Sequence, residues 1–226
     1  MELSPSVKAY LASPEAQAAM ERVAAMTPEQ RSRLTQQPTV AFEWDPVKAA
    51  DDYVARYWAM YTAADWDKLP SDLVLAAQSI LKDGRGFYLW GGPGVGKTWA
   101  LVALFKLLAR QHEEVALISW LDMRDQIQSD FDKPAHDRRE AHYFRTVGVL
   151  LIDDFASGRM TEWAAETLAQ IIEHRQRNNR LTLITSNYAR QQLPSVIGGM
   201  DGERIASRIA ALCDGYHMVG KDRRLA

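Results

Sequence analysis

The feature that most constrains this chain is a glycine-rich segment with the pattern G-x-x-x-x-G-K-T, which spans residues 91–98. It follows an apolar run over residues 86–90 and precedes residues 99–109, which have the composition of a buried helix. A strand, a glycine-rich turn and a helix in this order place backbone N–H groups and a helix N-terminus around phosphate oxygens. The pattern therefore predicts a nucleotide phosphate site built from Gly91, Gly92, Pro93, Gly94, Val95, Gly96, Lys97 and Thr98.

Two side chains at the end of this segment have predicted roles. The ammonium of Lys97 is expected to bind the β- and γ-phosphates, and the hydroxyl of Thr98 is expected to bind Mg²⁺. The predicted cofactors are therefore ATP and Mg²⁺. The alternative interpretation is a tight glycine turn that binds nothing, but a chance match to the whole pattern in a chain of this length is rare.

From residue 85 onward, apolar runs of strand length alternate with helical stretches, which is typical of a parallel sheet with crossover helices. Three of the runs are nearly continuous in Val, Ile and Leu, as expected for strands that helices bury on both faces. The sequence therefore predicts an α/β fold with a five-stranded parallel sheet between helices. The candidate strands are residues 86–90, 114–120, 147–153, 181–186 and 215–219.

The candidate strand at residues 147–153 ends in two adjacent carboxylates, Asp153 and Asp154. Because ligands in α/β sheets lie at the carboxyl ends of strands, this pair is expected beside the phosphate loop. Asp153 is predicted to hold Mg²⁺ through water, and Asp154 to orient and polarise the attacking water. The alternative is a turn-forming Asp-Asp after a buried strand.

Asn187 directly follows another apolar run. It is the side chain best placed there to contact the γ-phosphate or the attacking water. A strand-end Asn is equally suited to cap a helix, and this interpretation stays open.

Arg204 and Arg208 lie four residues apart on one face of a predicted helix. An arginine presented across a subunit boundary can stabilise the transition state on a neighbour's nucleotide. The alternative is a solvated helix face on which these arginines pair locally with Glu203 and Asp201.

The first 60 residues read as short helices, because a capping side chain precedes a proline at four places along this segment. A linker is plausible at residues 37–45, before a helix from Pro46 to about Tyr61. Aromatic residues recur there at helical spacing, and packed core is the favoured interpretation over a partner-binding face. We expect a helical N-terminal region at residues 1–60, a possible partner-docking segment, and an ATPase domain at residues 61–226.

With these elements in this order, the chain resembles AAA+ ATPases of the DnaC/IstB type, which are helicase loaders and transposition helper ATPases. The resemblance covers roughly residues 62–226. It rests on GGPGVGKT at 91–98, LLIDD at 150–154, TLITSN at 182–187, ERIASRI at 203–209 and GKDRR at 220–224. It implies a P-loop NTPase core with Walker A at residues 91–98, Walker B at Asp153 and Asp154, and sensor 1 at Asn187. It further implies an arginine finger at Arg208, with Arg204 in reserve. Many AAA+ proteins have Glu where this chain has Asp154, and the shorter carboxylate suggests slow, switch-like hydrolysis.

The resemblance also implies partners: a replicative DNA helicase, single-stranded DNA, and further copies of the chain with the arginine finger acting in trans. The alternatives are a transposition helper that hands DNA to a transposase, a small-molecule kinase and a non-hydrolysing adaptor. Basic candidates for DNA contact, with aromatic residues available to stack on bases, are Lys106, Arg110, Arg124, Arg138, Arg139, Arg175, Arg177, Arg180, Trp120 and Phe131.

Composition sets limits on these interpretations. The formal net charge of −2 excludes a polybasic protein, so any DNA contact needs a local patch. The single cysteine, Cys213, cannot form an internal disulfide and fits a reducing compartment. No apolar run approaches the length of a membrane span and the start lacks a signal-peptide pattern, so we expect a cytoplasmic protein without membrane contact.

Overall fold

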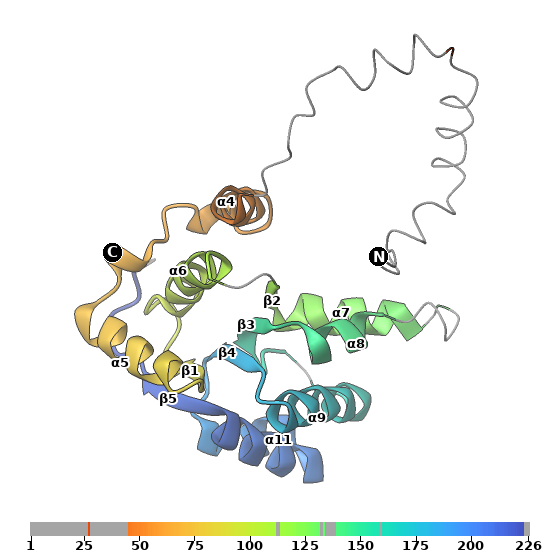
Figure 1. The fold of residues 1–226 in the computed structure, drawn as a ribbon. Coiled ribbons are helices and arrows are strands. Elements are labelled where there is room, and N and C mark those ends of the chain that lie inside the picture. The colour runs from red at the N-terminus through yellow and green to blue at the C-terminus, as the bar shows by residue number, and fades with distance from the viewer. Residues whose placement is uncertain are drawn as a thin grey trace. The chain divides into compact units, whose positions relative to one another are not determined.

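The computed structural model describes residues 27, 45–111, 114–131, 133, 139–158 and 160–223. The predictions for short helices and a linker before residue 45 lie outside these residues. The described part is an α/β fold in which helices cover both faces of one sheet (Figure 1). The predicted fold class is confirmed.

The sheet contains five parallel strands in the order β2-β3-β4-β1-β5. Their bounds are Gly86–Trp90 for β1, Val115–Ser119 for β2, Val149–Phe155 for β3, Leu181–Ser186 for β4 and Cys213–His217 for β5. The predicted bounds of β1 and β4 are confirmed, and β2 is one residue shorter at each end than predicted.

Two strands lie two residues away from their predicted bounds. β3 runs on to Phe155, which is fully buried and pairs with Ser186 of β4. β5 begins at Cys213, directly after a helix ends, because Cys213 pairs with Gly86 at the start of β1. The apolar residues that suggested a strand over 215–219 continue past the strand's end, and Met218 is buried there without belonging to it.

Helices fill the connections between the strands. Their bounds are Pro46–Tyr57 for α4, Ser71–Lys82 for α5, Lys97–Ala109 for α6, Trp120–Phe131 for α7, Glu140–Thr146 for α8, Glu162–Arg177 for α9, Leu193–Ile197 for α10 and Gly199–Leu212 for α11. Short 3₁₀ turns occupy Ala59–Tyr61 (η1), Trp66–Lys68 (η2) and Arg190–Gln192 (η4). The helix predicted from Pro46 to about Tyr61 instead ends at Tyr57 and is followed by the η1 turn.

Successive apolar residues of the strands point alternately into two cores on opposite faces of the sheet. Phe87 and Leu89 of β1 pack with α6, α5 and α4, whereas Tyr88 packs with α9, α11 and their neighbours. The helix α6 lies over one face of the sheet and α9 and α11 lie over the other (Figure 1). Burial on both faces explains why the strands read as continuous apolar runs.

The helix α4 illustrates how local sequence signals place an element. The Asp45 carboxylate accepts hydrogen bonds from the N–H groups of Val47 and Lys48, and Pro46 occupies the first helical position. Its buried face packs against α6, and Tyr53 lies against Phe105 with a ring-centroid distance of 5.5 Å. The aromatic side chains at this end of the chain are largely packed, as favoured from the sequence, although Tyr57 is 60% exposed. The division at residue 60 stays a prediction.

Within the described residues, no helix has the length and apolar character that crossing a bilayer requires.

Candidate functional site

The phosphate loop connects β1 to α6, at the carboxyl end of the sheet. Gly94 and Gly96 have φ angles of +72° and +103°, in the left-handed region that side chains with a Cβ rarely adopt. The reversal they make brings Lys97 and Thr98 to the first positions of α6. Both side chains therefore stand at a helix N-terminus, where unpaired N–H groups favour an anion.

Lys97 is buried, with 8% of its surface exposed, and its ammonium donates hydrogen bonds within the chain. Its Nζ donates to the carbonyl oxygens of Gly91 and Gly92 at 2.9 and 2.7 Å, and to Asn187 Oδ1 at 2.9 Å. The lysine thus already joins the phosphate loop to the end of β4, although these residues lie 90 positions apart.

The two carboxylates at the end of β3 lie in a β-bulge. Ile152 pairs with Ile184 and Phe155 with Ser186, so Asp153 and Asp154 together oppose the single residue Thr185. Asp154 has a φ of +51°, and its backbone N–H donates to Thr185 Oγ1 at 3.0 Å. Bulges re-aim side chains, and this one lets both adjacent carboxylates line the same cavity.

Asp153 accepts hydrogen bonds from two hydroxyl groups. Thr98 Oγ1 lies 3.0 Å from Asp153 Oδ2, and Thr185 Oγ1 lies 2.5 Å from Asp153 Oδ1. Burial raises the pKa of the Asp153 carboxyl above its ordinary value, and the hydrogen bonds from Thr185 and Thr98 only partly offset this. A cation bound here would relieve the cost of burying the charge.

The residues around Asp153 fit Mg²⁺. Carboxylate and hydroxyl oxygens are the ligands that this ion prefers, and Mg²⁺ is usually bound by one or two carboxylates together with substrate phosphates. The described residues contain no cluster of three or more acidic, His or Cys side chains arranged to hold a metal. The ion would therefore depend on Thr98, Asp153 and phosphate oxygens.

Asn187 and Asp154 are in direct contact across the carboxyl ends of β4 and β3. Asn187 Nδ2 donates to Asp154 Oδ1 at 3.0 Å, while its Oδ1 accepts from Lys97. Asn187 therefore links the residue predicted to bind phosphate to the carboxylate predicted to orient water. The three side chains line a cavity of about 500 Å³, within the range of small-molecule sites.

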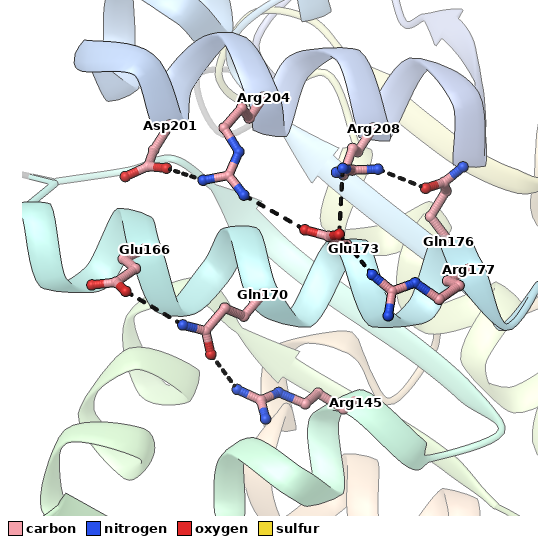
Figure 2. A network of polar contacts seen from close by, with 9 residues as sticks. All are labelled: Arg145, Glu166, Gln170, Glu173, Gln176, Arg177, Asp201, Arg204 and Arg208. Atoms are coloured by element: carbon pink, nitrogen blue, oxygen red, sulfur yellow. Dashed lines mark hydrogen bonds and ion pairs between the residues drawn. The ribbon is translucent and has the colours of Figure 1, made fainter.

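Arg204 and Arg208 lie apart from this cavity, on α11 where it packs against α9. Figure 2 shows both arginines directed at Glu173 of α9, with Nη2···Oε distances of 3.6 and 3.4 Å. Arg204 also pairs with Asp201 at 2.9 Å, and Arg208 donates to Gln176 at 3.0 Å. The local pairing to Asp201 was foreseen, whereas the shared contact to Glu173 was not. That either arginine contacts the nucleotide of a neighbouring subunit stays a prediction.

Two of the residues suggested for DNA contact are placed wrongly for it. Arg175 is fully buried, and its guanidinium donates to Thr182 Oγ1 and to carbonyl oxygens that include those of Val147 and Leu181. Trp120 is 2% exposed and packs against Phe155, so it cannot stack on a base. Lys106 is engaged with Asp51 at 2.9 Å. Arg138 and the side chain of Phe131 lie outside the described residues.

Sequence reasoning missed several of the residues that line the cavity. Thr185 is 1% exposed and contacts both Asp153 and the Asp154 backbone. The TLITSN segment contained this residue, but only the bulge in β3 gives its hydroxyl a role. Met60 and Arg223 line the cavity from distant parts of the chain. Trp99, in the first turn of α6, also lines the cavity, and Trp90 at the end of β1 stacks on His217 with a ring-centroid distance of 3.7 Å.

A phosphate loop, a carboxylate pair and a polar strand end, arranged in this way on a five-stranded parallel sheet, define a P-loop nucleotide-binding protein. More narrowly, the chain belongs to the family described as IstB-like ATP binding protein, whose model matches residues 34–216. The resemblance stated from the sequence is thereby confirmed.

Two relatives are similar to part of this chain. The chain is 26% identical over 111 residues to the replicative helicase loader DnaI of Bacillus subtilis, which covers 49% of this chain and 35% of that protein. It is 30% identical over 142 residues to an ATP-binding protein in an insertion sequence of Mycobacterium tuberculosis, covering 60% of this chain and 56% of the relative. The match thus spans about a third of the length of DnaI and somewhat over half of the insertion-sequence protein.

Solved structures show the same fold. The structure of the DnaC helicase loader matches with a TM-score of 0.62 at 23% identity, covering 71% of this chain and 99% of that one. The structure of DnaI matches with a TM-score of 0.58 at 24% identity, covering 71% and 90%. AMPPCP-bound DnaA from Aquifex aeolicus matches with a TM-score of 0.58 at 16% identity, covering 69% and 50%.

Proposed function

We propose that this chain hydrolyses ATP, slowly and as a switch, to load a replicative helicase onto single-stranded DNA. The observation that carries the hydrolytic part is the contact of Asn187 with both Lys97 and Asp154. A group that touches both the phosphate-binding lysine and the water-orienting carboxylate is suited to report whether a γ-phosphate is present. Membership of an ATP-binding family supports the choice of nucleotide.

The proposed chemistry divides among the chain's own residues. Lys97 and the loop N–H groups bind and orient the phosphates, and Asp154 accepts a hydrogen bond from the attacking water and aligns it. Mg²⁺ held by Thr98 and Asp153 would neutralise charge on the phosphate oxygens. The apolar side chains of Met60, Tyr61 and Trp99 line the same cavity and offer a surface for the adenine ring.

The loading role is supported by the similarity to DnaI, a protein named as a replicative helicase loader. In this role the work of ATP is conformational, because binding and hydrolysis change contacts with the helicase and DNA. We propose that several copies assemble and that Arg208, or Arg204 in its place, contacts the nucleotide of a neighbouring subunit. An action in trans is supported because both arginines are partly exposed and neither lines the nucleotide cavity of its own subunit.

A transposition helper is the second candidate, and one observation favours it. The insertion-sequence ATP-binding protein of Mycobacterium tuberculosis matches a longer stretch at higher identity than DnaI does. In this role the same ATPase core would hand DNA to a transposase.

The first experiment measures steady-state ATPase activity over a range of protein concentrations, with and without single-stranded DNA. We expect slow turnover whose specific rate rises with protein concentration, because the active site is shared between subunits, and responds to DNA. Specific activity that is independent of concentration and of DNA would contradict the assembly and DNA parts of the proposal. No turnover with intact ATP binding would contradict the hydrolytic part.

The second experiment distinguishes the two roles. The purified chain is incubated with ATP and single-stranded DNA, together with either the replicative helicase or a transposase of the source organism. Transfer of the helicase onto a circular single strand, which it cannot enter by an end, supports loading. ATP-dependent binding to the transposase and no effect on the helicase would replace loading with the transposition role.

A further inference from the structure

The segment after β5 runs along the phosphate loop. The backbone N–H of Met218 donates to the carbonyl of Trp90, the last residue of β1, at 2.8 Å, and the Met218 side chain is buried. Five residues later, the N–H of Arg223 donates to the carbonyl of Gly94 at 3.0 Å. Residues 218–223, which we call the strap, are therefore attached by backbone hydrogen bonds to the end of β1 at one end and to the phosphate loop at the other.

The middle of the loop is shaped to receive the strap. A Cβ added to Gly94 would lie 1.7 Å from Asp222 Oδ1, well inside van der Waals contact. Gly92 in the same loop has open space at the corresponding position. Gly94 has a positive φ that residues with a Cβ rarely adopt, and a larger residue there would also have to displace the Asp222 carboxylate.

This attachment brings the side chain of Arg223 to the nucleotide cavity. Its guanidinium carbon lies 3.7 Å from the position a Cβ would take on Gly96, and Arg223 lines the cavity with Lys97 and Thr98. Among the described residues that line it, Lys97 and Arg223 are cationic and Asp153 and Asp154 are acidic. Without Arg223, the charged side chains around the phosphates would carry a net negative charge.

We propose that the strap is part of the nucleotide site and that Arg223 binds phosphate oxygens of ATP held in the same subunit. This inference rests on the nucleotide binding that the proposed function requires, and it does not need hydrolysis or a helicase. A guanidinium offers several N–H donors in one plane and can bind two phosphate oxygens through parallel hydrogen bonds, a fixed geometry that an ammonium does not impose. Arg223 would thus complement Lys97, which approaches as a point charge.

The geometry separates the role of the Arg223 side chain from that of its backbone. The hydrogen bond to Gly94 comes from the Arg223 N–H, which every substitution except proline retains. Arg223→Ala and Arg223→Lys therefore remove or alter the guanidinium while leaving the strap attached. Lys221→Ala is the matched control, because Lys221 is an exposed cation of the same strap that does not line the cavity.

The experiment measures the equilibrium binding of ATP, ADP and inorganic tripolyphosphate to the full chain and its variants in the presence of Mg²⁺. We expect Arg223→Ala to weaken ATP binding about 10- to 100-fold, as the loss of hydrogen bonds to a charged group does. Arg223→Lys should recover part of this loss, tripolyphosphate should show the same ranking, and Lys221→Ala should stay within about twofold of the parent chain.

Equal ATP affinity of Arg223→Ala and Lys221→Ala would overturn the inference and leave the proposed function intact. Weakened ATP binding by Arg223→Ala, in a chain whose parent binds ATP without turning it over, would support the inference while contradicting the proposed hydrolysis. Thermal unfolding of each variant without nucleotide excludes a folding defect, because loss of a phosphate contact should leave that midpoint unchanged. A loss of ATP affinity accompanied by an equal fall in the nucleotide-free midpoint would overturn the inference in favour of a structural role.

Discussion

The nucleotide cavity and the arginine cluster, in which Arg204 and Arg208 of α11 contact Glu173 of α9, are both polar networks. They are held with very different strength. In the cavity, Lys97, Asp153 and Thr185 are buried and bond to partners that the sheet brings together from distant parts of the chain. In the cluster, Arg204 and Arg208 share the single carboxylate of Glu173 at the surface (Figure 2). Exposed ion pairs of this kind are worth between zero and about 1 kcal/mol each.

This difference in burial suits the two regions to different tasks. A preformed cavity suits chemistry, because its groups need little reorganisation when the substrate arrives. Weakly paired surface arginines suit an exchange of partners, since a neighbour's phosphates can replace one shared carboxylate at small cost. The four predictions below separate these two kinds of network.

The largest effect is expected for Lys97→Ala. The substitution removes the buried ammonium that contacts Gly91, Gly92 and Asn187, and we expect no measurable ATP binding in an equilibrium assay. Lys106→Ala is the control on the same helix, because Lys106 pairs with Asp51 outside the cavity and should leave the affinity unchanged. Retained micromolar affinity in Lys97→Ala would contradict the assignment of the phosphate loop.

Arg208→Ala should lower the ATPase rate about 10³-fold or more if Arg208 acts as an arginine finger. Mixing it with Lys97→Ala should restore part of the activity, because a neighbour with an intact finger can then serve an intact site. Arg177→Ala is the control, since Arg177 pairs with the same Glu173 at 2.8 Å from α9. If the ATPase rate of the mixture equals the sum of the rates of the two variants alone, Arg208 does not act across subunits.

Asp154→Asn should lower the ATPase rate about 10²- to 10⁴-fold while ATP still binds. Asn is the suitable replacement because Asp154 has a φ of +51°, and Asn tolerates the left-handed region better than most residues. Asp125→Asn on α7, whose carboxylate is largely exposed and pairs with Arg124, is the control. Undiminished hydrolysis by Asp154→Asn would show that another group positions the water.

The smallest effect is expected for Glu173→Gln. It removes the carboxylate shared by Arg177, Arg204 and Arg208, so we expect up to a fivefold rise in ATPase rate at protein concentrations below full assembly. Glu166→Gln on the same helix is the control, because Glu166 contacts only Gln170 in the network of Figure 2. A large fall in activity, with the fold intact, would mean that Glu173 holds the arginines in their working position.

The sequence predicted the site best where a residue type and its position along a strand decide the geometry. Lys97, Thr98, Asp153 and Asn187 meet at one edge of the sheet because parallel strands end there, and this can be read from apolar runs and polar ends. The contact of Asn187 with Asp154 was within reach of the same reasoning, although a helix cap was an equal alternative.

The remainder depends on contacts that no local pattern specifies. The bulge that gives Thr185 its partners arises from the pairing of β3 with β4, and the approach of Arg223 depends on the path of the chain after β5. Arg175 is an opposite case, because the sequence suggested an exposed residue and the structure buries it. An arginine near a helix end reads as surface, yet here its guanidinium satisfies buried carbonyl groups between α9, α8 and the sheet.

The position of α4 has a consequence for how copies of the chain can meet. β2 is an edge strand, and an edge with unpaired carbonyl groups can pair with a strand of another molecule. The Tyr53 hydroxyl of α4 donates to the Leu117 carbonyl of β2 at 2.6 Å, and so occupies one of these acceptors. This contact leaves one acceptor fewer at the β2 edge for a strand of another molecule. A sheet that continues between molecules is therefore disfavoured at β2, whereas β5 forms the opposite edge of the sheet.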